Sequence, residues 1–384
     1  MTDEPPPAPP QAPPRGRYLV LRRLALVASA TLLALLLGEL ACRVLAHAAN
    51  QDTLEVAFST QRHVEEGQRV ALIDILQMSP NDRIIFELKR GLRDVPFKGA
   101  PFSTNSHGFR GPEIDVAAGP DTVTVVGIGD SVMFGYGVAD DRPYLAVLEQ
   151  HLRRKYPQKQ WRCINTAAPA YNTVIEVETL RSRALPFGPD LVILGLVSND
   201  LVLPPYMRAV DDELDLGRSF LLEQLLKGTR WAVNRNGFEL REGRDSRLVF
   251  HAGLDEQPTN AGKYQELTGW EPFRAALREL DGLSREHGFQ VLSFTNTEDV
   301  TTQRMMKATT DLGWPHVRLL PEINQHLKQH GGGSWSPEHP EAYLASALSV
   351  APDDGHPSAL QHLMAASKLL GELERLGIIE RLLE

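Results

Sequence analysis

The stretch Val123-Thr-Val-Val-Gly-Ile-Gly-Asp-Ser-Val-Met-Phe-Gly-Tyr-Gly137 decides the fold of this chain. Its β-branched run predicts a buried strand. Gly129, Asp130 and Ser131 follow at once and allow two interpretations. Aspartate and serine are favoured caps of a helix that begins after a strand. The carboxyl end of a strand is also where α/β sheets place their ligands. Residues far downstream decide between the two.

Predicted strands and amphipathic helices alternate on both sides of this stretch. Alternation of this kind predicts an α/β fold, a three-layer α/β/α sandwich with a mostly parallel central sheet. The segment 190–197 is almost wholly apolar, so we expect it at the centre of the sheet. The expected strands are 121–129, 161–164, 190–197, 289–294 and 316–320, and the expected helices are 143–156, 174–185, 272–287, 300–312, 322–330 and 358–376.

The amino-terminal region predicts a tail followed by a membrane anchor. Residues 1–16 are rich in proline and predict a disordered tail. Residues 17–46 contain arginines, then an uncharged run from Leu24 to Gly38, and then further apolar residues. Together they supply the roughly 20 residues that a transmembrane helix needs. Glu39 and Arg43 are spaced as a helical ion pair.

The orientation of this segment predicts a location. Arginines on its amino side favour a cytoplasmic tail, with the inner membrane as partner and everything after residue 47 periplasmic or otherwise outside the cytoplasm. A cleaved signal peptide is an alternative, with Ala46-His-Ala48 as its cleavage site. A lipoprotein signal at Leu40-Ala-Cys42 is less favoured, because Glu39 occupies a position that should be apolar.

Two regions show no regular alternation. Residues 47–119 form an extension in which 70–77 and 83–89 predict short elements, and the turn-rich segment Phe102–Pro112 predicts a structural role. The main domain is expected at 120–384. Within it, residues 201–262 predict an insertion or lid, with a helix at 219–233 and a hairpin near 238–250.

Composition excludes several classes of protein. The 384 residues carry a net charge of −9, so the chain lacks the basic character of a general nucleic-acid-binding protein. Cys42 and Cys163 are the only cysteines, and neither has a companion at metal-ligand spacing. The sequence contains no phosphate-binding loop, no H-E-x-x-H and no C-x-x-C motif. The turn at Ser131 also differs from G-x-S-x-G, so the nucleophile elbow of α/β-hydrolases is absent.

Four polar stretches should meet at one edge of the sheet. They are Gly129-Asp-Ser-Val132, Asn165 to Tyr171, Val197-Ser-Asn-Asp200 and Asp353-Asp-Gly-His-Pro357. In this order they resemble the serine, glycine, asparagine and histidine blocks of the SGNH/GDSL hydrolase superfamily, over about residues 120–378. Asn105-Ser-His-Gly-Phe-Arg110 also resembles a segment that often precedes the serine block in membrane-anchored members. The resemblance implies a flavodoxin-like sheet and an acyl-serine mechanism with no cofactor and no metal.

The resemblance assigns catalytic roles to three residues. Ser131 is the nucleophile, and His356 is the base that takes its proton. The imidazole must be held in one tautomer by an acceptor on its other nitrogen. Asp353 is the expected acceptor, because it can fold back onto His356 within a single turn, and Asp354 is the alternative.

The resemblance also implies an oxyanion hole. Its donors are the backbone N–H of Ser131, the backbone N–H of Ala170 and the side-chain amide of Asn199. Gly129, Asp130 and Asp200 are expected to support the turns, the two aspartates by binding backbone. The family usually has glycine where this chain has Ala170 and Val197. Alanine can serve at 170 if φ is negative there, whereas a positive φ would strain the site.

These patterns predict a membrane-anchored extracytoplasmic serine esterase. The expected substrates are O-acyl groups of envelope or exported polysaccharide, or small or lipid esters. An O-acyltransferase would use the same acyl-enzyme with a sugar hydroxyl in place of water. A non-catalytic glycan-binding or scaffold protein is the alternative of another class, and Ala170 and Val197 are the features that favour it.

Overall fold

The computed structural model describes residues 15–49, 70–204, 206–208, 219, 221–222, 248–250, 264, 266–331 and 333–384. Most of the predicted helix 219–233 and most of the predicted hairpin 238–250 lie outside these ranges. The chain divides into two compact units, which are described separately. One comprises residues 1–51 and 210–240, and the other comprises residues 52–209 and 241–384.

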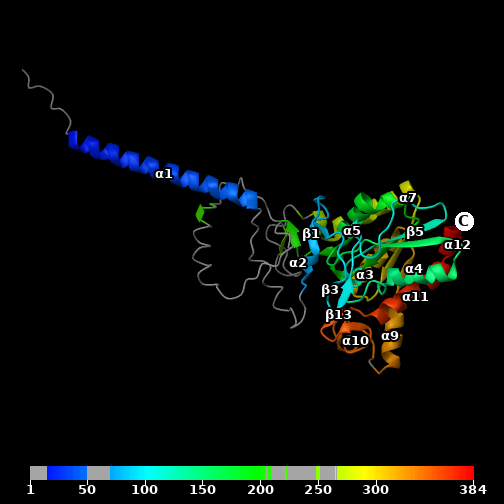
Figure 1. The fold of residues 1–384 in the computed structure, drawn as a ribbon. Coiled ribbons are helices and arrows are strands. Elements are labelled where there is room, and N and C mark those ends of the chain that lie inside the picture. The colour runs from blue at the N-terminus through cyan, green and yellow to red at the C-terminus, as the bar shows by residue number, and fades with distance from the viewer. Residues whose placement is uncertain are drawn as a thin grey trace, which may run out of the picture. The chain divides into compact units, whose positions relative to one another are not determined.

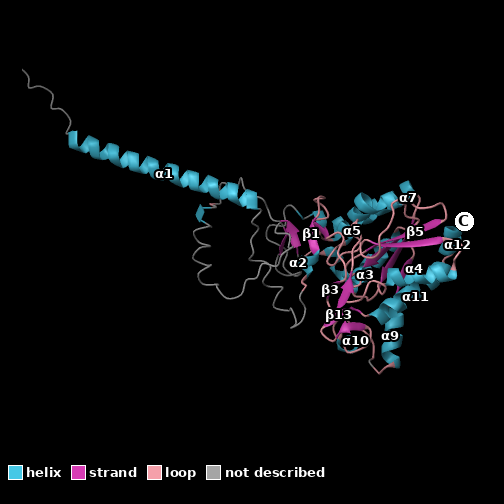
Figure 2. Cartoon of the chain, in the orientation of Figure 1, coloured by secondary structure: helices cyan, strands magenta, loops and turns pink. Residues whose placement is uncertain are grey.

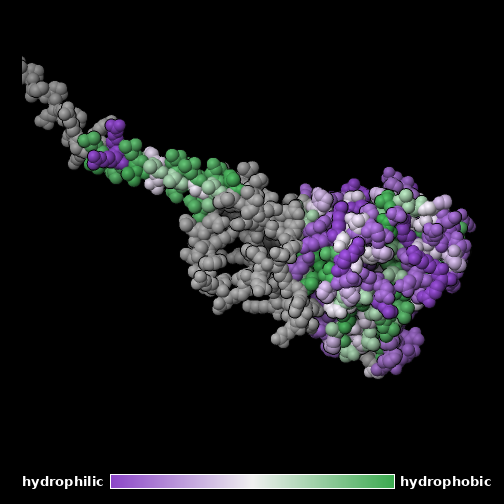
Figure 3. Space-filling view, viewed as in Figure 1, coloured by the Kyte–Doolittle hydropathy of each residue, from purple (hydrophilic) through white to green (hydrophobic). Residues whose placement is uncertain are grey.

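The first unit contains one long apolar helix, α1 (Arg15–Ala49). Its segment Leu19–Val44 is 26 residues long with a mean hydropathy of 2.1. At 1.5 Å per residue such a helix exceeds the roughly 30 Å of a bilayer core. Figure 3 shows apolar residues along most of its length. The predicted pair forms, since Arg43 Nε donates to Glu39 Oε1 at 2.9 Å. By length and composition, α1 meets the requirements of a membrane span, and a signal sequence near the amino terminus meets the same requirements.

A five-stranded parallel sheet forms the middle layer of the second unit (Figure 2). Its order is β11-β10-β7-β5-β6, and the central position of β7 agrees with the prediction. Along the chain, the first three strands of this sheet are β5, β6 and β7, and they lie in the order second, first, third, which is the flavodoxin-like arrangement. Its strands are β5 (Thr122–Ile128), β6 (Gln160–Asn165), β7 (Leu191–Leu196), β10 (Gln290–Thr295) and β11 (His316–Arg318).

Helices cover the sheet on both faces, as predicted. Helices α4 (Tyr144–Lys155) and α11 (Ala359–Arg375) pack together on one side, and α5 (Thr173–Thr179) and α7 (Trp270–His287) pack together on the other (Figure 1). The same unit also contains α8 (Val300–Asp311), α9 (Leu320–Gln329), α10 (Glu341–Leu344) and α12 (Ile378–Leu383).

Local sequence explains where two of these helices begin and end. The Asp299 carboxylate accepts from Thr302 N at 2.7 Å and caps α8. Helix α5 is shorter than the predicted helix 174–185. It continues as a π-turn, Leu180–Ala184, and a 3₁₀ turn, Leu185–Phe187, which contains Pro186. Proline cannot donate the hydrogen bond that an α-helix would need at that position.

The extension packs into the same core as the sheet. It forms α2 (Leu72–Ile75), the antiparallel pair β1 (Leu76–Met78) and β2 (Phe86–Leu88), and the hairpin β3 (Val95–Phe97) and β4 (Ala100–Phe102). The first three elements lie in the two segments for which short elements were predicted. The second hairpin was not predicted, because each of its three-residue strands has a central proline, which disfavours a strand. Phe86, Phe97 and Phe102 are nevertheless buried with the core of the sheet.

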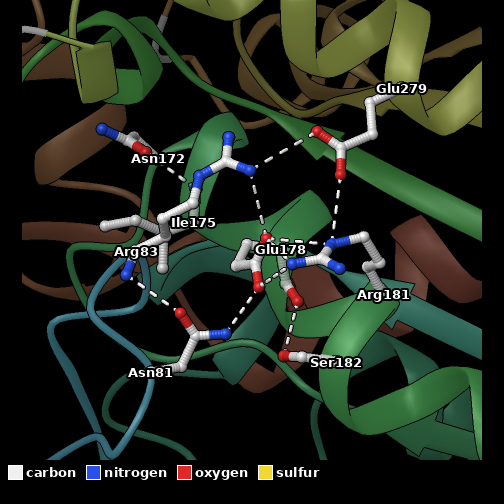
Figure 4. Close-up of polar contacts among 8 residues, drawn as sticks. All are labelled: Asn81, Arg83, Asn172, Ile175, Glu178, Arg181, Ser182 and Glu279. Carbon is white, nitrogen blue, oxygen red and sulfur yellow. Dashed lines mark hydrogen bonds and ion pairs between the residues drawn. The ribbon is translucent and has the colours of Figure 1, made fainter.

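An ionic cluster around the buried Glu178 ties the extension to helices α5 and α7 (Figure 4). Glu178 of α5 is 1% exposed. It accepts from Arg181 Nη2 at 2.7 Å, from Asn81 Nδ2 at 2.5 Å and from Arg83 Nη1 at 3.3 Å. Glu279 of α7 lies 3.2 Å from Arg181 Nε and 3.8 Å from Arg83 Nη1. Arg83 and Arg181 therefore each bridge Glu178 of α5 and Glu279 of α7, and Arg83 belongs to the extension.

The predicted insertion is described in part. Strand β8 (Tyr206–Arg208) pairs with β9 (Leu248–Phe250) in antiparallel register. The pair lies against the extension, because the rings of Tyr206 and Phe86 meet edge-on with centroids 6.3 Å apart.

Candidate active site

Ser131 lies at the sheet edge where β5 ends. Asp130 caps the short helix α3 (Ser131–Phe134) by accepting from Val132 N at 2.9 Å. Ser131 is therefore the first helical residue rather than the cap. Gly129 is required by close packing, since a Cβ there would lie 2.8 Å from Met133 Cβ. The strand order reverses between β5 and β7, so Ser131 also sits at the topological switch point, where ligands bind in such sheets.

A hairpin near the carboxyl end of the chain brings His356 to Ser131. Strands β12 (Ser349–Ala351) and β13 (Asp354–Pro357) are antiparallel and are joined by a two-residue turn. His356 Nε2 lies 2.9 Å from Ser131 Oγ. On the other side of the ring, Nδ1 lies 2.5 Å from Asp354 Oδ1. The structure thus joins the predicted nucleophile and the predicted base directly.

The carboxylate on His356 is Asp354, and the prediction of Asp353 is wrong. Asp354 and His356 are two residues apart on β13, so their side chains point to the same side of the strand. Asp353 lies in the turn before the strand, and its side chain is exposed. The prediction assumed a helix-like turn ahead of α11, in which a spacing of three residues brings side chains together. In a strand the effective spacing is two.

The environment keeps Asp354 ionised. Burial alone would raise its pKa, but hydrogen bonds and charge from His356, together with the charge of Lys98, hold the pKa below its usual value. An ionised Asp354 accepts from Nδ1–H and leaves the Nε2 lone pair facing the serine hydroxyl. This is the tautomer in which His356 can take a proton from Ser131.

Tyr136 fixes the plane of the imidazole. Its ring stacks on His356 with centroids 4.1 Å apart and planes 22° apart. Its backbone N–H donates to Ser131 O at 3.1 Å, so the residue is tied to the same turn as the nucleophile. Sequence analysis did not identify Tyr136. Its position five residues after the serine, among the glycines at 135 and 137, is the signal that was available.

The three predicted oxyanion donors follow three neighbouring strands. Ala170 lies in the loop after β6, Ser131 follows β5, and Asn199 lies in the 3₁₀ turn Ser198–Leu201 after β7. Parallel strands that are adjacent in a sheet end at the same edge. The structure therefore brings the three residues to the same edge of the sheet as His356.

Ala170 adopts the strained backbone that sequence analysis considered. Tyr171 N donates to Ala168 O at 3.2 Å, which closes a turn with Pro169 and Ala170 in the middle. The φ of Ala170 is +68°. Proline followed by a residue with positive φ is the pattern of a type II turn, whose third position favours glycine. Position 197 shows no such strain, because Val197 has an extended backbone with φ −137°.

Three buried carboxyl groups support the site from below. Asp130 Oδ2 lies 3.1 Å from Ser131 Oγ, and Asp200 Oδ2 accepts from Val197 N at 3.1 Å. Both aspartates thus bind backbone N–H groups, as predicted. Glu176 of α5 is 1% exposed, and neither of its carboxyl oxygens has a hydrogen-bond partner among the described residues. Burial raises the pKa of all three groups, and their mutual repulsion raises the pKa of Glu176 and Asp200 further.

Arg110 of the extension holds the segment that follows the nucleophile. Its guanidinium donates to Phe134 O at 2.8 Å, to Gly135 O at 2.6 Å and to Val138 O. Asp140 pairs with it at 3.1 Å. Burial lowers the pKa of Arg110 to about 10, against the opposing charge of Asp140. The segment Asn105–Arg110 was expected to be structural, and its arginine gives that role a definite form.

Metal chemistry was not expected from the sequence. Within the described ranges, no group of three or more His, Cys, Asp and Glu side chains could hold a metal ion.

The chain was compared with family models, curated proteins and solved structures. No protein-family model and no curated protein matches the chain. LAE5, an α/β hydrolase from the metagenome of Lake Arreo in Spain, is 14% identical over 67% of this chain and 96% of its own length, with a TM-score of 0.37. A variant of Axe2, an acetylxylan esterase of Geobacillus stearothermophilus, is 15% identical over 67% and 96%, with a TM-score of 0.39. A Desulfitobacterium hafniense protein assigned to the lipolytic G-D-S-L family is 10% identical over 64% and 97%, with a TM-score of 0.36. The chain is similar to these proteins.

The two adjacent aspartates give a matched test of the hydrogen bond to His356. We expect Asp354→Asn to lower kcat for an activated ester by about 1,000- to 10,000-fold, because the amide favours the wrong imidazole tautomer. Asp353→Asn should leave kcat unchanged, because that side chain is exposed in the turn. Steady-state kinetics of the two purified variants decide the point. A large loss in Asp353→Asn with little loss in Asp354→Asn would contradict the assignment.

Ala170→Gly should stabilise the protein. The left-handed conformation is unfavourable for alanine by about 1–2 kcal/mol, while glycine adds about 0.4–1 kcal/mol of freedom to the unfolded chain. We therefore expect the free energy of unfolding to rise by up to about 1 kcal/mol, measured by urea denaturation. Ala168→Gly is the control. Ala168 is buried in the same loop and has no positive φ, so glycine there should be destabilising. Equal losses in both variants would show that the backbone at Ala170 is unstrained.

Proposed function

We propose that this chain is a serine ester hydrolase of the SGNH type. The observation that carries the proposal is the continuous path from Ser131 Oγ to His356 Nε2, and from His356 Nδ1 to Asp354 Oδ1, with separations of 2.9 and 2.5 Å. A nucleophile, a base and an orienting acid within hydrogen-bond reach are the arrangement that activates a serine hydroxyl. The resemblance of four sequence blocks to this superfamily supports the same conclusion.

The geometry supports a two-step reaction. Ser131 Oγ attacks the ester carbonyl carbon while its proton moves to His356 Nε2, and Asp354 stabilises the imidazolium that forms. The carbonyl bond re-forms, the alcohol leaves with the proton from Nε2, and an acyl-serine remains. Water then attacks the acyl carbon and gives its proton to Nε2. The carboxylic acid leaves, and Ser131 Oγ recovers its proton from the imidazolium.

We assign the oxyanion hole to the Ser131 N–H, the Ala170 N–H and the Asn199 amide. Each step passes through a tetrahedral intermediate whose negative oxygen needs preorganised donors. The positive φ of Ala170 supports this role, because backbone strain in proteins is concentrated at functional positions.

The proposed substrates are O-acyl groups of envelope or exported polysaccharide, or small or lipid esters. A domain tethered outside the cytoplasm would meet such esters on the envelope. An O-acyltransferase would pass through the same acyl-serine and would be recognised by transfer to a sugar hydroxyl in place of hydrolysis.

A labelling experiment tests the proposal. The full chain in detergent micelles should react with a fluorophosphonate, and Ser131→Ala should abolish the labelling. Asn199→Ala should retain the fold and lower kcat by about 100- to 1,000-fold, the usual effect of losing one oxyanion donor. Labelling that survives Ser131→Ala would refute the nucleophile. A well-folded wild type that never labels would favour a non-catalytic glycan-binding protein.

We also propose that α1 is an uncleaved anchor in the inner membrane, with its amino end in the cytoplasm and the hydrolase domain in the periplasm. The arginines near its amino end support this orientation, as does the 26-residue apolar length. Intact-mass measurement of the membrane-extracted protein should find residues 1–48 present, and external protease should digest the domain in spheroplasts. A mature chain that begins after Ala48 would show instead that α1 is a cleaved signal.

A further inference from the structure

The β3–β4 hairpin of the extension carries a cation beside the catalytic hairpin, which consists of β12 and β13 and bears Asp354 and His356. Lys98 and Gly99 form its two-residue tip, because Phe97 pairs with Ala100 across the turn. The Lys98 ammonium lies 5.4 Å from the centre of the Tyr136 ring. The same ring stacks on His356 at 4.1 Å. The sum of these two distances is the upper limit on the separation of the ammonium from the imidazole.

Aromatic packing holds this hairpin in place. The Phe97 ring meets the Tyr136 ring edge-on at 5.0 Å, and it also meets Phe102 and Phe134 edge-on. Ala100 and Val350 line the same surface pocket, so β4 and the catalytic hairpin border each other there. The base of the hairpin is thus packed against the residues that surround His356, and Lys98 at its tip is held close to them.

The ammonium has no carboxylate partner in the described part of the chain. No carboxylate oxygen there lies within 4.0 Å of Lys98 Nζ, although the side chain is only partly exposed. The charge of Lys98 lowers the pKa of Asp354 at longer range, but the Asp354 carboxylate binds the Nδ1 atom of His356. A cation at the rim of the site therefore remains able to bind an anion.

The backbone at the tip does not favour lysine. The φ angles of Lys98 and Gly99 are +53° and +81°, which is the pattern of a type I′ turn. Asn-Gly is the preferred pair in such turns, and a long side chain in the left-handed region is unfavourable. A residue in a disfavoured backbone conformation beside a reactive group is a reason to look for a function of its side chain.

We propose that Lys98 is a specificity-determining residue that binds an anionic group on the alcohol portion of the ester. This inference rests on the proposed esterase function and narrows its substrates to negatively charged ones, such as O-acylated hexuronates or sugar phosphates. The ammonium attracts the anion and orients the alcohol portion of the ester while Ser131 attacks the carbonyl. Attraction over these distances is only partly screened, because the Debye length is about 8 Å at physiological salt.

The test compares three acetyl esters of a sugar that carry a neutral group, a carboxylate or a phosphate. They are a methyl O-acetyl-hexoside, the corresponding O-acetyl-hexuronoside and the corresponding O-acetyl-hexoside phosphate. Lys98→Asn removes the charge and installs the favoured type I′ pair, so the hairpin should be at least as stable as in the wild type. We expect kcat/KM for one or both anionic esters to fall about tenfold, as for the loss of a charged hydrogen bond, and kcat/KM for the neutral ester to stay unchanged.

Controls separate binding from support of the imidazole. Lys98→Arg should retain the preference for the anionic esters. Raising NaCl from about 0.05 M to about 0.5 M should weaken that preference in the wild type and not in Lys98→Asn. The two anionic esters also distinguish a carboxylate from a phosphate as the preferred group. An equal fall for all three esters in Lys98→Asn, with a shifted pH profile, would overturn the proposal in favour of a role through Asp354.

Two further outcomes have distinct meanings. Unchanged kcat/KM for every ester in Lys98→Asn would refute anion binding at this position. If the wild type hydrolyses none of the esters but still labels at Ser131, only the choice of sugar esters is wrong, and a neutral and an anionic aryl acetate replace them. If the wild type does not label at all, the esterase function itself fails, and Lys98 has no substrate to select.

Discussion

The buried guanidinium of Arg110 makes the interactions on which the turn after Ser131 depends. It donates hydrogen bonds to three carbonyl oxygens in the segment 134–138, and its side chain is 2% exposed. A short helix followed at once by a positive-φ glycine, as α3 is, leaves carbonyls with no partner of their own. Arg110 supplies those partners from a different part of the chain. Its backbone also forms a bridge with Asn165 at the end of β6. One residue thus couples the turn of the nucleophile to the strand that leads to Ala170, and removal of the side chain would leave buried carbonyls unpaired.

Sequence predicted the sheet and the order of the site blocks because both depend on local patterns. Apolar runs such as Leu191–Leu196 identify themselves, and so do the polar stretches that follow them. Sequence preferred Asp353 to Asp354 as the partner of His356, because the two residues are identical in type and differ only in backbone geometry. In a strand, side chains two positions apart point to the same side, whereas in a helical turn side chains three positions apart do so. The Pro-Asp pair before the strand is a turn signal that could have indicated the hairpin. The φ of Ala170 and the contacts of Arg110 depend on tertiary packing, which no local pattern encodes.

Helix α5 carries two buried glutamates with opposite environments. Glu178 faces the extension and is surrounded by guanidinium groups and an amide (Figure 4). Glu176 faces the site. Burial is the main cause that raises its pKa, and the charges of Asp200 and Asp130 raise it further. The first arrangement ties layers together, since each charge is compensated. The second favours the neutral carboxyl, because two or three adjacent carboxylates in a dry interior repel one another. Negative charge is therefore limited near Ser131, and buried polar atoms without partners among the described residues, such as the Glu176 carboxyl oxygens, remain there.

These features make the extension part of the same packed unit as the candidate active site. Residues 70–119 share one core with the sheet, supply Arg110 to the turn of the nucleophile, and place Phe97 against the ring that stacks on His356. A parallel sheet fixes the positions of strand ends, but it does not fix the plane of an imidazole carried by a hairpin outside the sheet. The Tyr136 ring stacks on the imidazole and holds its plane, and Phe97 packs edge-on against the same Tyr136 ring. The sheet thus determines where the serine lies, and the extension helps to determine how the histidine meets it.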